Sequence, residues 1–148
     1  MSTVIFDDQG NLYGTASKGG NNVGIVYELQ PGGNHWKPSM LYNFCSRNNC
    51  IDGITPQTAL TRDANGILYG TTLAGGKACS ECGLVFKLEH TKYGWLETVL
   101  HAFAGGPDGS NPAGSLILDT QGNLYGATTY GNAHQGNSGY GTVFEITP

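Results

Sequence analysis

The chain has 148 residues, of which 39% are hydrophobic, 10% aromatic and only 12% charged, and its formal net charge is −4. This apolar content excludes an intrinsically disordered chain, and the lack of a basic cluster argues against nucleic acid as a partner. No apolar run reaches the roughly 20 residues that span a bilayer, and the first residues lack the basic and apolar regions of a signal peptide. We therefore expect a folded domain without a membrane span, whose export signal, if it has one, lies outside this sequence.

The first predicted elements form a β-hairpin. A β-branched run over residues 2–6 and a strand that begins at Leu12 flank a polar loop, in which Gly10 can take a positive φ. Residues 24–29 and 36–44 are predicted as a third and a fourth strand, because a Pro-Gly-Gly turn separates them. The first 44 residues therefore predict four consecutive strands.

The same order of strands returns twice along the chain. The second set covers residues 57–62, 67–72, 83–88 and 95–103, and the third covers residues 115–118, 124–129 and 141–146 without a fourth strand. No segment shows a helical period, so we predict an all-β chain with about 11 strands.

A hairpin of the pattern Asp-x-x-Gly recurs over residues 7–14, 63–70 and 119–126, and its glycines Gly10, Gly66 and Gly122 are 56 residues apart. We predict a single repeat domain over residues 1–148, with repeats at 1–44, 45–103 and 104–148, the last one incomplete.

Four antiparallel strands per repeat indicate β-propeller-like blades, about 2.6 repeats of 56 residues in this chain. A β-trefoil of three four-stranded repeats is the alternative. A propeller ring does not close with 2.6 blades, so the propeller interpretation predicts a homo-oligomer or part of a longer repeat chain.

Several motifs resemble the Gloeo/Verruco tandem repeat. They are LHAF (residues 100–103), DGSNP (108–112), LILDTQGNLYGATTYG (116–131) and GTVFEITP (141–148), with matching segments in the second repeat. The resemblance implies a propeller-like array in secreted or surface bacterial proteins, with no assigned activity and no catalytic residues to carry over. The hairpin is also similar to six-bladed propeller repeats of the NHL and gluconolactonase-like kinds.

The four cysteines form two close pairs, Cys45 with Cys50 and Cys79 with Cys82, and three disulfide connectivities are formally possible. Pairing within each loop is favoured because each pair lies in one predicted loop. A four-thiolate zinc site is the alternative. Disulfides indicate an oxidising compartment, so the expected location is extracellular or at the cell surface, and we expect no metal and no cofactor.

The up-and-down order of strands places the Asp-x-x-Gly hairpins on one face and the loops that differ between repeats on the other. The Asp of each hairpin is interpreted as a turn residue that accepts hydrogen bonds from backbone amides. The face that carries the differing loops, here called the variable-loop face, comprises residues 18–23, 76–82 and 130–140 with the linkers 46–56 and 104–112. Recognition usually lies in such loops.

Within this face, residues 130–140 combine aromatic rings with amide side chains, which suits sugars. The predicted ligand-binding residues are Tyr130, Asn132, His134, Gln135, Asn137 and Tyr140. We therefore expect a non-catalytic extracellular module that binds a carbohydrate or a protein partner.

Two other functions stay open at this level. One is a polysaccharide-acting hydrolase or lyase that uses Asp108, Asp52 or His134, since paired carboxylates can serve as general acid and base. Asp52 and Asp108 are repeated 56 residues apart, however, which favours turn formation over catalysis. The other is a purely structural fragment of a larger adhesive array.

Overall fold

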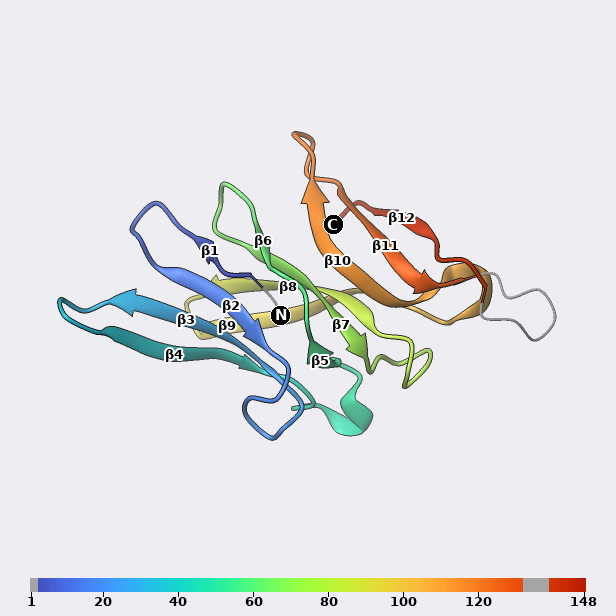
Figure 1. The fold of residues 1–148 in the computed structure, drawn as a ribbon, viewed down its shortest axis with the longest axis horizontal. Coiled ribbons are helices and arrows are strands. Elements are labelled where there is room, and N and C mark those ends of the chain that lie inside the picture. The colour runs from blue at the N-terminus through green and yellow to red at the C-terminus, as the bar shows by residue number, and fades with distance from the viewer. Residues whose placement is uncertain (1–2, 132–138) are drawn as a thin grey trace.

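The computed structural model describes residues 3–131 and 139–148, and in these ranges it contains three antiparallel sheets and no α-helix (Figure 1). The all-β prediction is thereby confirmed. The first sheet has its strands in chain order, namely β1 (Ile5–Phe6), β2 (Leu12–Ala16), β3 (Ile25–Pro31) and β4 (Trp36–Asn43).

The second and third sheets repeat this order. The second contains β5 (Ile54–Pro56), β6 (Thr61–Arg62), β7 (Leu68–Ala74), β8 (Leu84–Thr91) and β9 (Gly94–Ala102), with both β5 and β6 paired to β7. The third contains β10 (Ser110–Leu118), β11 (Leu124–Tyr130) and β12 (Val143–Ile146). One short 3-10 helix lies in each linker between sheets, at Asn48–Cys50 and Gly106–Asp108.

The innermost strands begin earlier in the chain than the sequence predicts. Pro56 lies opposite Thr72, and Pro112 lies opposite Thr128, so the end of each D-G-x-x-P segment belongs to a sheet. The sequence alone places these segments in the linkers 46–56 and 104–112. Proline is tolerated here because β5 and β10 are the first strands of their sheets and have a free edge.

Each sheet contains a glycine that lies beneath an aromatic ring of the neighbouring strand. The pairs are Gly14 with Tyr27, Gly70 with Phe86 and Gly126 with Phe144. A Cβ atom on Gly70 would lie 2.7 Å from Cζ of Phe86, closer than packed carbon atoms allow. The repeated glycine therefore makes the room that the repeated ring fills.

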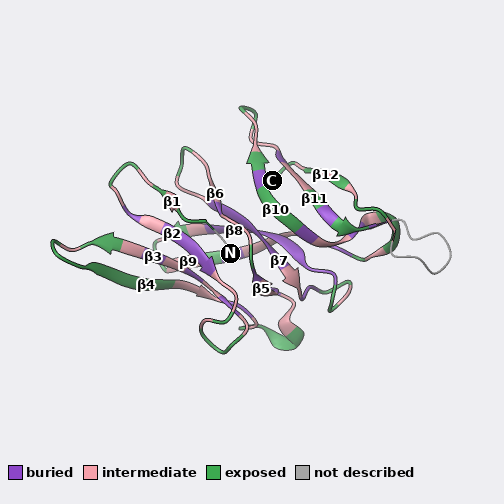
Figure 2. Cartoon of the chain, viewed as in Figure 1, coloured by how far each residue is buried: buried purple, intermediate pink, exposed green. Residues whose placement is uncertain are grey.

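Two hydrophobic cores join the three sheets, and in Figure 2 the buried segments concentrate on the second sheet and the strands that face it. The first core includes Val26, Phe44, Leu68 and Phe86, and the second includes Val85, Phe103, Leu116 and Leu124. The two outer sheets each cover the second sheet with one face and leave the other face open. No helix in the described ranges is long and apolar enough to cross a membrane.

Candidate functional site

The hairpin face is formed by turns whose polar groups bond one another. In the third hairpin, Oδ1 of Asp119 accepts from the backbone amides of Gln121 and Asn123, each at 2.8 Å, and Oδ2 accepts from the side-chain amide of Asn123 at 2.9 Å and the hydroxyl of Tyr125 at 3.2 Å. The Asn123 bonds lower the pKa of Asp119. Asp7 and Asp63 repeat these turn contacts, so the turn interpretation is confirmed.

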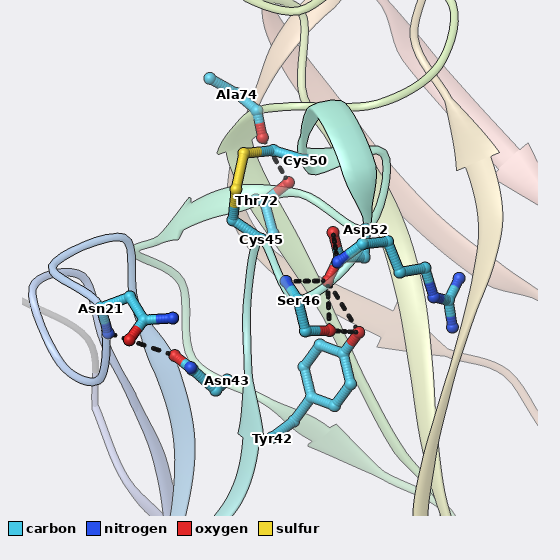
Figure 3. Close-up of a disulfide and its surroundings, with 10 residues drawn as sticks. Asn21, Tyr42, Asn43, Cys45, Ser46, Cys50, Asp52, Thr72 and Ala74 are labelled. Carbon is cyan, nitrogen blue, oxygen red and sulfur yellow. Dashed lines mark hydrogen bonds between the residues drawn. A yellow bond between two sulfur atoms is a disulfide. The ribbon is translucent and has the colours of Figure 1, made fainter.

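Both cysteine pairs are disulfides, as the loop argument predicted: Cys45 with Cys50, shown in Figure 3, and Cys79 with Cys82. Bridged sulfurs are not thiolates, so the zinc alternative does not hold. Among the residues that the structure describes, no group of three or more His, Cys, Asp or Glu side chains is arranged around a common point.

Asp52 is buried at the end of the first disulfide loop and is surrounded by donors (Figure 3). Its Oδ2 accepts from the hydroxyl of Tyr42 at 2.8 Å and from both the backbone amide and the hydroxyl of Ser46, each at 2.9 Å. Burial, with a contribution from Asp52, raises the pKa of Tyr42. These bonds tie the linker to the end of β4.

Asp108 makes the matching contacts in the next linker. Nε2 of His101 lies 3.0 and 3.1 Å from its two oxygens, and the backbone amide of Ala104 donates to Oδ2 at 2.7 Å. His101 precedes the buried Phe103 by two residues, as Tyr42 precedes Phe44. The structure thus pairs each linker aspartate with an aromatic residue near the end of the preceding strand, Tyr42 in β4 and His101 in β9.

An ion pair whose carboxylate is buried lies next to this cluster. Nη2 of Arg47 is 2.9 Å from Oε2 of Glu97, and the same nitrogen donates to the backbone carbonyl of Glu97 at 2.9 Å. The Glu97 side chain has no exposed surface, and burial raises its pKa to about 7, with Arg47 opposing and Asp52 reinforcing the shift. Sequence reasoning missed Glu97 because a single acidic residue in a strand carries no signal of burial.

A hollow of about 420 Å³ lies beside this ion pair and is called here the basic hollow. Its polar lining comes from Arg47, Lys77 and His101, and its apolar lining from Ile51, Val99, Leu100 and Ala102. The side chains of Arg47 and His101 are 40% and 38% exposed. Two cationic groups and an imidazole around an apolar floor favour a ligand that carries a carboxylate or another anionic group.

The predicted ligand loop is described only at its two ends. Tyr130 ends β11 with 47% of its surface exposed, and Tyr140 is 96% exposed. Asn132, His134, Gln135 and Asn137 lie outside the described residues. The two rings are therefore available on the variable-loop face, and the role of the four polar residues stays a prediction.

Comparison with known proteins gives one match. A family model described as the Gloeobacter/Verrucomicrobia repeat covers residues 1–148. No curated protein and no solved structure matches the chain.

Proposed function

Because the chain belongs to the Gloeobacter/Verrucomicrobia repeat family, we propose that it is a propeller-like, non-catalytic binding module that holds a carboxylate-bearing carbohydrate on its variable-loop face. The basic hollow carries this proposal. It is concave, it combines cationic and apolar lining, and it lies between the end of β9 and loops that differ between the repeats, which supply Arg47, Ile51 and Lys77.

The propeller-like arrangement is supported by contacts that recur between successive sheets. The amide of Thr55 donates to the carbonyl of Val23 at 2.6 Å between the first and second sheets, and the amide of Asn111 donates to the carbonyl of Cys82 at 2.6 Å between the second and third. Propeller blades are four-stranded antiparallel sheets related by such radial repetition. The three sheets are therefore interpreted as successive blades, of which the last has three strands in the described ranges.

The two disulfides support an extracellular or cell-surface location. Disulfides persist in oxidising environments and are rare in the cytosol. Acidic polysaccharides present the carboxylates that the basic hollow favours.

In the proposed binding mode, Lys77 and Arg47 contact a sugar carboxylate while the apolar floor covers the CH face of the ring. Arg47 already donates to Glu97, so it is held in place before the ligand arrives, and little side-chain entropy is lost on binding. Tyr130 and Tyr140 supply exposed rings on which further sugar units can pack.

The test is a glycan array with acidic and neutral oligosaccharides, followed by titration calorimetry with the best ligand. Lys77→Ala is expected to weaken binding about tenfold, because it removes one charge-assisted contact, and added salt is expected to weaken it further. Lys92→Ala is the matched control, since Lys92 lies beside Tyr93 in the β8–β9 turn. Equal losses in the two variants, or no glycan bound at all, would overturn the carbohydrate proposal in favour of a protein partner.

A polysaccharide-acting hydrolase or lyase is the second candidate, and the contact between Asp108 and His101 is the observation that favours it. A carboxylate beside an imidazole is an acid–base pair. Because the same carboxylate also binds the Ala104 amide, the turn role ranks first and we expect no turnover. Hydrolysis or elimination on a polysaccharide panel that Asp108→Asn abolishes without unfolding the protein would establish the enzyme instead.

A further inference from the structure

The inner edge of β2 is paired over only part of its length. In the first sheet, the described pairs on this edge are Ile5 with Tyr13 and Phe6 with Leu12. In the second sheet the same edge of β7 continues, with Pro56 opposite Thr72 and Ile54 opposite Ala74. One repeat of 56 residues relates Thr72 and Ala74 to Ala16 and Lys18. Ala16 pairs with Ile25 of β3 on the opposite edge, and on the inner edge no strand of the described ranges pairs with Ala16 or Lys18.

A hollow of about 780 Å³ lies along this edge. Its lining comes from residues 15–19 of the first repeat, together with Tyr27, Pro56 and Gln57. At the corresponding junction of the second and third sheets, where β5 and β6 fill the edge of β7, the hollow is only about 240 Å³. The larger hollow is therefore the space that an inner strand segment fills in the next repeat.

The two filled junctions show what such a segment looks like. In both, a proline packs on a glycine of the preceding sheet: a Cβ atom on Gly83 would lie 2.8 Å from Cδ of Pro112, and one on Gly24 would overlap Pro56. In both, the residue before the proline has a positive φ and donates its amide to the preceding sheet, at Thr55 and Asn111. The common chemistry is an extended D-G-x-x-P segment.

We propose that the edge of β2 at residues 16–18 binds an extended D-G-x-x-P segment of this repeat, by addition of an antiparallel strand. The proline lies opposite Ala16, and the residue two before it lies opposite Lys18, as in the second sheet. We infer the sequence of the bound segment from residues 52–56 and 108–112. These two segments of the chain occupy the same edge in the second and third sheets.

The probe is a blocked synthetic peptide with the sequence of residues 52–59, DGITPQTA, titrated into the isotope-labelled chain and followed by amide chemical shifts. The expected result is saturable shifts at residues 15–19 that a scrambled peptide of the same composition does not cause. Shifts confined to other residues, equal shifts from both peptides, or no shifts at several millimolar peptide would overturn the proposal.

Two matched variants locate the contact. Tyr27→Leu removes a ring that lines the hollow, and Phe144→Leu removes the equivalent ring of the third sheet, which does not line it. The peptide is expected to bind Tyr27→Leu at least about threefold more weakly than the parent chain and to bind Phe144→Leu unchanged. Equal affinities for the two variants, both folded, would contradict the assignment. This test uses no carbohydrate, so its outcome is independent of the proposed glycan binding.

Discussion

At the scale of single residues, the repeated carboxylates and the unrepeated ones have different roles. Asp7, Asp63 and Asp119 each bind the amides of their own turn. Glu97 does not belong to a repeated turn of this kind. Its side chain is instead buried against Arg47. The repeated aspartates hold the geometry of the turns, whereas the basic hollow takes Arg47 and Lys77 from loops that differ between the repeats.

Replacing a hairpin carboxylate is expected to cost stability. Asp63→Ala removes the acceptor for two backbone amides at 2.8 and 2.9 Å, and we expect the free energy of unfolding to fall by about 1–2 kcal/mol. Asp8→Ala is the control, because it removes the same charge from a side chain whose nearest cation, Arg62, is 3.9 Å away. Chemical denaturation measures both, and equal losses in the two variants would show that charge, not the turn, is responsible.

The raised pKa of Glu97 predicts a pH dependence of stability. The folded state keeps the proton up to about pH 7, whereas the ordinary pKa is 4.5, so the contribution of this group to stability falls as the pH rises through this interval. Glu97→Gln cannot ionise. Between about pH 5 and about pH 8 its free energy of unfolding, relative to the parent chain, is expected to rise by about 2 kcal/mol.

Urea denaturation at several pH values checks this prediction. Glu89→Gln on the neighbouring strand is the control, because Glu89 is partly exposed beside Lys87, and its stability is expected to follow that of the parent chain. Parallel stability profiles for Glu97→Gln and the parent chain would show that Glu97 is ionised throughout the interval.

At the scale of elements, the contact between strand glycine and aromatic ring is the unit that repeats. Gly70→Ala places a Cβ atom 2.7 Å from Phe86 and 3.0 Å from Leu60, and we expect a loss of about 1–3 kcal/mol from overpacking. Phe86→Leu in the same chain makes room for the new methyl group, so the double variant is expected to lose less than the sum of the two single losses. Strictly additive losses, measured by denaturation of all four proteins, would contradict this packing account.

Most strands and both disulfides follow from the sequence, because alternating apolar residues and loop-local cysteines are local signals. The strand segments at Ile54–Pro56 and at residues 110–114 were missed, because only the long-range pairing with β7 and β11 reveals them, whereas residues 115–118 of β10 were predicted as a strand. The pairing of Tyr42 with Asp52 and of His101 with Asp108 was missed for a related reason. The only trace of these two contacts in the sequence is that each aspartate follows a repeated aromatic-x-Phe segment.

The basic hollow could not be predicted from local patterns. Arg47 comes from the first linker, Lys77 from the β7–β8 loop and His101 from β9, so only the packing of three separate segments brings them together. The sugar-binding loop was predicted from its composition of aromatic and amide side chains. Four of its six named residues lie outside the described ranges.

At the scale of the whole molecule, the two outer sheets present faces that the repeat normally covers. Val26 and Val85 are fully buried at the two internal junctions, whereas the equivalent Val143 of the third sheet is 84% exposed. The opposite outer face, on the first sheet, carries Val4 at 42% exposure and the half-buried Tyr27. These two faces correspond to the two sides of an internal junction, so they are complementary and favour head-to-tail association, either between chains or within a longer repeat chain.

The most direct test of this repeating array is light scattering of the chain over a range of concentrations. We expect a mass that rises toward that of two chains, and we expect Val143→Glu to keep the protein at the mass of one chain. Tyr93→Glu, which alters a residue that is 88% exposed in the β8–β9 turn, is predicted to associate like the parent chain. A parent chain that stays at the mass of one chain at every concentration, or one whose association survives Val143→Glu, would contradict the account.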